Sequence, residues 1–302
     1  MSDYKRVLMM QKVKLKGYEK SIRNFWDQYR ESGMGLLGLG ILLFFVFAST
    51  FAEVLTPYPV GVREGDREAI LKPPSRKYLL GTDEFGRDML SIIIQGGRVS
   101  LLIGFLATLV TALIGTLVGI SAGYFGGKTE EILMRFTDLL LVIPGLPLMI
   151  VLASILGATF WNMILVIGIR GWTGTARVLR AQVISLKEKP FIESARAIGA
   201  SDTRIIARHI LPNVLPLIVA QMVLRVGSSI LSAASLSFLG LGDPTHISWG
   251  MTLHYSFSVG SLFSNFYWYL LPPGICITLV VLAFTFIGYA LDQIVNPRIR
   301  RR

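Results

Sequence analysis

Residues 98–123 read RVSLLIGFLATLVTALIGTLVGISAG, in which Arg98 is the only charged residue. A helix needs about 20 predominantly apolar residues to cross a lipid bilayer, and this stretch exceeds that length. The whole chain of 302 residues is 52% hydrophobic and only 16% charged, with a mean hydropathy of +0.58. Soluble domains contain about one quarter charged residues. The sequence therefore predicts an all-α, polytopic membrane protein.

Further apolar stretches extend this prediction to six transmembrane helices. Basic residues concentrate before residue 35, in residues 180–213 and in residues 298–302. Lys and Arg in short loops mark the cytoplasmic side, so both termini are predicted to be cytoplasmic. The net charge of +11 then reflects orientation in the membrane, and no nucleic-acid partner is expected. The additional stretches lie near residues 35–55, 132–156, 159–179, 214–239 and 269–290.

The same pattern divides the chain into four regions. In the first, Ile22, Phe25, Trp26 and Tyr29 recur at helical spacing among basic residues, which predicts an amphipathic helix on the membrane surface. The regions are a cytoplasmic tail (1–34), the first transmembrane helix with an extracytoplasmic loop (35–97), a core transmembrane domain (98–290) and a cytoplasmic basic tail (291–302).

Small residues and prolines within the spans predict how the helices pack. Gly115, Gly119 and Gly123 lie on one face of the second span, a spacing that lets helices approach closely in lipid. Pro144 and Pro147 flank Gly145 and predict a break in the third span. The single cysteine, Cys276, lies in an apolar run and is interpreted as a core residue.

Two arginines fall inside predicted spans. A guanidinium near the middle of a bilayer costs at least about 2.5–3.5 kcal/mol, and such groups usually face a bundle interior or water. One interpretation is that Arg170 and Arg225 line a translocation pathway; the other is that each extends to the membrane interface or pairs with another subunit. Asp138, near the end of the third span, is expected to pair with Arg135 one turn away.

Residues for chemistry are missing from the sequence. No group of His, Cys and carboxylate residues has the spacing of a metal site, and no pattern typical of an intramembrane hydrolase occurs. Residues 122–129 resemble a phosphate-binding loop, but they join two predicted spans rather than a strand and a helix. The chain is therefore expected to have no enzymatic activity and no cofactor of its own.

The segment 190–212, which follows the fourth span, is amphipathic on both sides of a glycine. Pro190 suits the first turn of a helix, and Glu193 suits its positive end. Gly199 permits a sharp turn, and Ser201 with Asp202 can cap a second helix. Pro212 is expected to close the segment. A helix–turn–helix on the membrane face predicts a docking element for a soluble partner.

This segment resembles the EAA loop of ABC importer permeases, which reads Glu-Ala-Ala, three residues, Gly, nine residues, then Ile-x-Leu-Pro. Glu193, Ala195 and Gly199 match this pattern, as does Leu211-Pro212; Ser194 replaces one Ala and His209 stands at the Ile position. Three further blocks resemble the peptide/nickel family, specifically its C-type dipeptide and oligopeptide permease subunit. They are GTDEFGRD (81–88) with GRVSL (97–101), ASLSFLGLG (234–242) and SWG (248–250).

The resemblance implies a type I importer permease that forms half of a membrane heterodimer. Its partners would be a second homologous permease, two ATPase subunits that bind ATP and Mg²⁺, and an extracytoplasmic solute-binding protein, all at the cell (inner) membrane. The substrate would be a dipeptide or oligopeptide, with nickel and oligosaccharides as alternatives. A stand-alone secondary transporter or channel is the rival class. The resemblance assigns ATPase coupling to Glu193, Ser194, Ala195, Gly199, Asp202, His209, Leu211 and Pro212.

Overall fold

The structure is a computed structural model that describes residues 23, 26–56, 58 and 65–295. Within these ranges the regular elements are helices, as the sequence predicts. In chain order they are α2 (Gly33–Thr50), α3 (Ala52–Leu55), the 3-10 turn η1 (Arg67–Ala69), α4 (Met89–Phe125), α5 (Gly127–Val142), α6 (Gly145–Leu156), α7 (Phe160–Lys187), α8 (Pro190–Ala197), α9 (Asp202–Ile205), the π-helical turn η2 (Ile206–Ile210), α10 (Leu211–Leu236), the π-helical turn η3 (Ser237–Leu241), α11 (Trp249–Ser258) and α12 (Tyr267–Val295).

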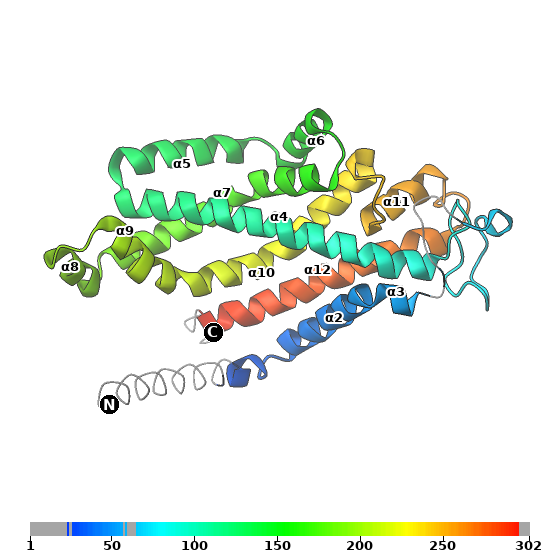
Figure 1. Cartoon of the computed structure of the whole chain (residues 1–302), viewed down its shortest axis with the longest axis horizontal. Coiled ribbons are helices and arrows are strands. Elements are labelled where there is room, and N and C mark those ends of the chain that lie inside the picture. The colour runs from blue at the N-terminus through cyan, green and yellow to red at the C-terminus, as the bar shows by residue number, and fades with distance from the viewer. Residues whose placement is uncertain (1–22, 24–25, 57, 59–64, 296–302) are drawn as a thin grey trace, which may run out of the picture.

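The long helices run back and forth along one axis (Figure 1). Helix α2 runs toward the end of the bundle that holds residues 65–88, which we call the cap end. Helix α4 returns from it, α5 and α6 run toward it again, and α7 leads back to α8 and α9 at the opposite end. Helix α10 then runs toward the cap end and α12 returns from it. The described start of α2 and the end of α12 therefore lie toward the α8 end.

Four helical runs are long and apolar enough to cross a membrane: Gly33–Thr50, Met89–Phe125, Asp202–Leu241 and Tyr267–Ile294. Helices α5 and α6 pass the same test only as a pair, which is bent by 92° at its break. Helix α7 has 28 residues, which is long enough, but its arginines and other polar residues lower its hydropathy. Composition within the described residues thus supports four or five of the six predicted spans.

The glycine face of α4 packs directly on α7. The backbone of α7 lies so close that a Cβ at any of the three glycines would be within 3 Å of it or of a Cβ. The predicted close approach of two helices is therefore confirmed. The nearest atoms are the Thr175 Cβ at 2.8 Å from position 115, the Ala176 carbonyl at 2.7 Å from position 119, and the Arg180 carbonyl at 2.8 Å from position 123.

Two alanine substitutions should have opposite effects. Gly119→Ala is expected to destabilise the fold by about 1–3 kcal/mol, because the methyl group would meet the Ala176 carbonyl and the Leu179 Cβ. Gly40→Ala in α2 meets no atom within 4 Å and should stabilise by up to about 1 kcal/mol through helix propensity. Thermal unfolding in detergent measures both. Equal unfolding midpoints would contradict this packing.

The third predicted span is broken where the sequence predicts it. Helix α5 ends at Val142, and α6 starts at Gly145 with Pro144 as its N-cap. Pro147 falls in the first turn of α6, where a proline costs no intrahelical hydrogen bond. The bend places the amino terminus of α6 against α7, where Gly145 contacts the Arg170 guanidinium.

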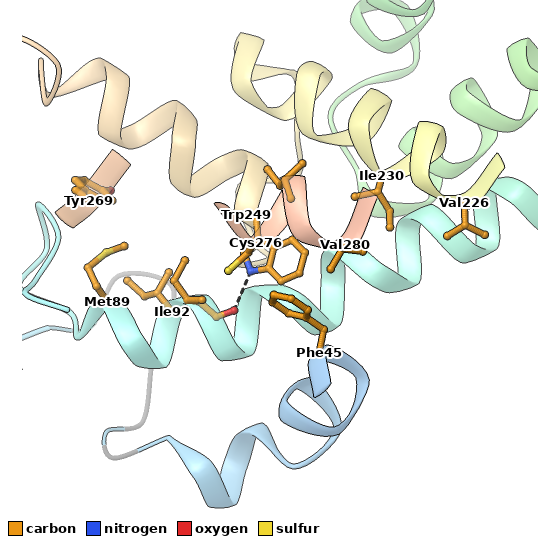
Figure 2. Close-up of a cluster of buried hydrophobic side chains, with 11 residues drawn as sticks. Phe45, Met89, Ile92, Val226, Ile230, Trp249, Tyr269, Cys276 and Val280 are labelled. Atoms are coloured by element: carbon orange, nitrogen blue, oxygen red, sulfur yellow. Dashed lines mark hydrogen bonds between the residues drawn. The ribbon is translucent and has the colours of Figure 1, made fainter. Parts of the chain in front are cut away.

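A buried cluster near the cap end joins α2, α4, α10, α11 and α12 (Figure 2). Its centre is Trp249, which is 1% exposed and donates its indole N–H to the Ile93 carbonyl at 2.8 Å. The Phe45 ring meets the Trp249 ring edge-on, with centroids 5.5 Å apart. Cys276 lies in the same cluster, so its prediction as a core residue is confirmed.

The segment before α4 is held by a buried ion pair. The Arg87 Nε lies 2.6 Å from the Asp83 Oδ2, and both side chains are almost fully buried. The other Asp83 oxygen accepts from the backbone N–H groups of Phe85 and Arg87. Asp88 then caps α4 by accepting from the Ser91 N–H. This cap explains why α4 starts at Met89, well before the predicted edge near residue 98.

Asp243 fixes the link between η3 and α11. Its carboxylate accepts from the Phe160 N–H at the start of α7 at 2.9 Å, and from the Thr245 N–H and hydroxyl at 2.8 Å and 2.6 Å. Burial opposes ionisation of this group, but these hydrogen bonds and the contact with His246 outweigh it and lower the pKa of Asp243. A charged Asp243 therefore ties this link to α7.

The predicted amphipathic helix of the N-terminal tail is described only in part. Ile22 and Phe25 lie outside the described residues. Tyr29 is 4% exposed, packs with Ile287 and Ala290 of α12, and donates its hydroxyl to the Gly35 carbonyl at 2.9 Å. Tyr29 therefore anchors the start of α2 to α12. Most of the C-terminal tail, residues 296–302, also lies outside the described part of the chain.

Candidate functional site

The segment 190–212 folds as two short helices with a turn between them. Pro190 occupies the first turn of α8, where its fixed φ is already helical, and Glu193 lies in the same turn beside the positive end of the helix. Ser201 caps α9 by accepting from the Arg204 N–H at 3.4 Å. The predicted helix–turn–helix is therefore present, with its helix starts formed as the sequence indicates.

Gly199 makes the turn between the two helices. Its φ is +81°, in the left-handed region that favours glycine. The Gly199 N–H donates to the Arg196 carbonyl at 2.9 Å, and the Ala200 N–H donates to the Ala195 carbonyl at 3.0 Å. These bonds close the end of α8 in the manner of a glycine C-cap. A Cβ would find open space here, so the demand for glycine is conformational rather than steric.

The inner face of the segment is a packed apolar core. Ile192 and Ala195 of α8 are buried, as are Ile205 and Ile210 of the second arm. They share one cluster with side chains of α4, α7 and α10. The neighbours in this cluster include Ala112, Ile120, Tyr124, Leu179, Val183, Val214 and Ile218. Since the core spans three long helices, the segment moves only together with the bundle.

Tyr124, near the end of α4, fastens the segment to the bundle through polar contacts. Its hydroxyl donates to the Asp202 Oδ1 at 2.6 Å. The Arg196 guanidinium lies 5.5 Å from the centre of the same ring, and the Lys187 Nζ lies 5.9 Å from it. Both distances are typical of cation–π contacts. Tyr124 thus contacts both arms of the segment and the end of α7.

Tyr124→Phe is expected to loosen this attachment. The lost hydrogen bond should cost about 1 kcal/mol, because the exposed Asp202 carboxylate regains water. Hydrogen exchange of the backbone amides in α9 should become about fivefold faster. Tyr289→Phe removes the hydroxyl of an exposed tyrosine in α12 and should leave that exchange unchanged. Identical exchange in the two variants would show that Tyr124 does not fasten the segment.

The outer face of the segment carries apolar side chains in an otherwise polar surface. Ile198 is 86% exposed and Phe191 is 42% exposed. The Phe191 ring lies 6.2 Å from the His209 ring of the second arm. Glu193 is also exposed. Exposed apolar residues at the tip of a rigid projection are typical of a protein-docking surface.

The residues of the EAA pattern divide between these two faces. Ala195 faces the core, and Asp202 binds Tyr124. The Ser194 hydroxyl donates to the Pro190 carbonyl at 2.9 Å and so stays within α8. The exposed positions are Glu193, Gly199, Leu211 and Pro212, with His209 half-buried beside Phe191.

The prediction that Pro212 closes the segment is wrong. The chain stays helical from Asp202 to Leu241, and Pro212 falls in the first turn of α10. The π-helical turn η2 precedes it, and the Leu211 N–H donates to the Ile206 carbonyl five residues earlier. A proline inside a helix lacks an N–H and crowds the carbonyl four residues before it. The wider π turn accommodates the proline without ending the helix.

The prediction that Asp138 pairs with Arg135 is also wrong. The Arg177 Nη2 of α7 lies 2.5 Å from the Asp138 Oδ1. Arg135 instead lies 2.6 Å from the Glu131 carboxylate. A glutamate four residues before an arginine is the favoured order for a pair on one helix. Asp138 is left to join α5 to α7.

Arg170 and Arg225, which the sequence marks only as costly, lie beside one helix. The Arg225 guanidinium of α10 contacts Gly174 of α7, and Gly174 is one helical turn from Arg170. The Arg170 guanidinium in turn contacts Gly145.

Sequence reasoning misses Tyr124, Phe191 and Ile198. Phe191 and Ile198 carry a signal, because they are apolar residues among charged ones in a short cytoplasmic-type loop. Tyr124 carries none, since its partner Asp202 is far away in sequence.

Comparison with known families follows these features. Residues 115–301 match the family described as binding-protein-dependent transport system inner membrane component. Residues 21–74 match the N-terminal TM domain of oligopeptide transport permease C. The first match covers more than half of the chain and includes the whole 190–212 segment.

Curated relatives align over nearly the full length. The dipeptide transport system permease protein DppC of Bacillus subtilis (strain 168) is 35% identical over 277 residues, covering 91% of this chain and 85% of the relative. The glutathione transport system permease protein GsiD of Pectobacterium atrosepticum is 36% identical over 288 residues, covering 93% and 94%.

A solved structure shares the fold. An inward-facing structure of the MetNI methionine ABC transporter aligns with a TM-score of 0.54 at 20% identity, covering 71% of this chain and 98% of that chain. The family matches, the relatives and the fold agree with the resemblance found in the EAA pattern. The chain belongs to the family of binding-protein-dependent transport system inner membrane components, and it is a permease component of an ABC importer.

Proposed function

We propose that this chain forms half of the translocation pathway of a peptide importer in the cell (inner) membrane. It works beside a second homologous permease, with two ATPase subunits on the cytoplasmic side and a solute-binding protein outside. The relatives that carry the names dipeptide and glutathione permease support a peptide as the substrate. The partner ATPases bind ATP and Mg²⁺, and this chain performs no chemistry.

The course of the helices supports six spans with both termini in the cytoplasm. Helix α2 starts and α12 ends toward the α8 end (Figure 1). That end also holds the basic 180–213 region, which the positive-inside rule assigns to the cytoplasm. Helix α7 serves as the remaining span. Its arginines are acceptable in a bilayer if they face other helices or water, as they do in a bundle interior.

The 190–212 segment carries the proposal. Its outer face presents Phe191 and Ile198, and its inner face is locked to α4, α7 and α10 by a buried core and by Tyr124. An ATPase docked on the outer face therefore pushes on three long helices at once. Closure of the ATPases on ATP would rock the bundle between inward-facing and outward-facing states.

Affinity purification of the tagged chain from its own membranes in mild detergent tests the assembly. A second permease and two P-loop ATPases should co-purify with the wild-type chain. The double variant Glu193→Lys, Gly199→Leu should lose the ATPases and keep the second permease, because the changes lie on the outer face and in the turn. Ser185→Glu, an exposed change on α7 outside the segment, serves as the control.

Uptake into proteoliposomes separates the importer from its rivals. The complete assembly with the binding protein should accumulate radiolabelled alanyl-alanine only when ATP is present. Recovery of the chain alone or as a homo-oligomer that moves solute without ATP would instead establish a secondary transporter or channel.

A further inference from the structure

Two guanidinium groups lie next to one another halfway along the bundle. Arg225 is in the middle of α10, and its guanidinium rests on Gly174 of α7, where a Cβ would displace it. Arg170 is one turn before Gly174 on the same face of α7, so the Cβ of Arg170 lies about 5–6 Å from position 174. The two groups are close enough to repel each other electrostatically.

The two arginines share no carboxylate within the described part of the chain. None of the ion pairs found there includes Arg170 or Arg225. The next arginines along α7 behave differently, since Arg177 pairs with Asp138 and Arg180 pairs with Glu130. Two adjacent cations without an anion are costly in a membrane bundle, so a negative group must approach them from outside the chain.

A positive helix end adds to the same location. Arg170 contacts Gly145, the first residue of α6, where the helix dipole places partial positive charge. Pro144, at the N-cap, has no side-chain oxygen that could accept from the first amides of α6. The broken span therefore points its amino terminus at the arginine pair rather than at a cap of its own.

One face of α10 connects this location with the cap end. Ser228, Ser232 and Ser235 follow Arg225 at intervals of three, seven and ten residues, which places them on one side of the helix. Their hydroxyls donate to carbonyls within α10, so their oxygens stay available as acceptors toward the outside. A row of hydroxyls offers a polar track through an otherwise apolar helix surface.

Extension to the membrane interface does not explain the geometry. An arginine that reaches for the interface directs its charge along its own helix toward the nearer end. Arg225 is about 20 Å from the start of α10, and its guanidinium crosses to α7 instead.

We infer that Arg170 and Arg225 form a carboxylate-binding site in the translocation pathway, reached from the cap end along the serine face of α10. The ligand is the carboxylate of a transported peptide, which two guanidinium groups bind through paired, charge-assisted hydrogen bonds. This inference rests on the proposed peptide-import function. It assigns the two arginines a task in moving the substrate, separate from ATPase docking.

The test uses the complete importer in proteoliposomes, with the wild-type binding protein and radiolabelled alanyl-alanine as the probe. The variants are Arg170→Gln, Arg225→Gln, the double Gln variant and the matching Lys variants. Arg177→Gln, two turns along α7 and paired with Asp138, is the matched control. Three quantities are measured: co-purification of the second permease, ATP hydrolysis stimulated by the loaded binding protein, and peptide moved per ATP hydrolysed.

The double Gln variant should assemble normally and hydrolyse ATP at a rate near that of the wild type. Its peptide moved per ATP should fall about tenfold or more, as expected for the loss of hydrogen bonds between charged groups. The Lys variants should recover part of this ratio because they keep the charge. Arg177→Gln should match the wild type.

Other results overturn the inference. An unchanged ratio of peptide to ATP in the double Gln variant would remove the arginines from the pathway. Loss of the second permease from that variant would place them at the subunit interface, where they bind a carboxylate of the partner. Wild-type importer that hydrolyses ATP but moves no peptide would refute the proposed substrate itself, which distinguishes the two failures.

Discussion

An importer assembled with Ile198→Glu is expected to lose its ATPase subunits and its ATP-driven uptake, while this chain unfolds at an unchanged temperature. Ile198 is 86% exposed at the tip of the 190–212 segment, so a charge there costs the isolated chain nothing. Central apolar residues of an interface contribute about 2 kcal/mol or more to binding, which is about thirtyfold in affinity. Titration of purified ATPase onto the permease in nanodiscs measures this change.

The same titration needs a charge-matched control. Ser185→Glu adds an identical charge at an exposed site on α7, close to the segment but outside it. Its ATPase affinity should stay within about threefold of the wild type. If Ile198→Glu binds ATPase as tightly as Ser185→Glu does, the apolar tip is not part of the docking surface.

Arg87→Ala is expected to destabilise the cap end by about 3–5 kcal/mol, the cost of leaving a buried carboxylate without its partner. The lost contact is the 2.6 Å ion pair with Asp83, whose side chain is fully buried. Equilibrium unfolding in mixed micelles gives the free energy, and tryptophan fluorescence is a suitable signal because Trp268 lies over Thr82 in the same region.

A second arginine provides the comparison. Arg98 pairs with Glu53 at 3.7 Å, and both side chains are largely exposed. Arg98→Ala should therefore cost less than about 1 kcal/mol. Similar losses in the two variants would mean that burial does not strengthen the dependence on the Asp83–Arg87 pair.

Features that depend on neighbouring residues in sequence are predictable here. The apolar runs predict the long helices, the Pro144–Pro147 pair predicts the break between α5 and α6, and the glycine face of α4 predicts a close helix contact. Gly199 predicts a turn because a left-handed backbone angle favours glycine wherever it occurs. Each of these follows from local geometry and needs no knowledge of the partner helix.

Features that depend on distant residues are not predictable from one sequence. Asp138 has an arginine one turn away, yet it pairs with Arg177 across two helices. Arg170 and Arg225 are separately conspicuous, but only the fold shows that Gly174 gives one of them room beside the other. Pro212 is locally a helix stop, and it fails as one because η2 widens the helix before it.

The unbroken helical run from Asp202 to Leu241 is 40 residues long, or about 60 Å. It extends from the second arm of the docking segment through Arg225 to the link that Asp243 fixes. A rod of this length acts as a seesaw: a tilt of about 10° about its midpoint swings each tip by about 5 Å. Arg225 is about 5 Å from that midpoint and hardly moves. An ATPase that pushes one tip thus opens and closes the far entrance while the arginine pair stays in place.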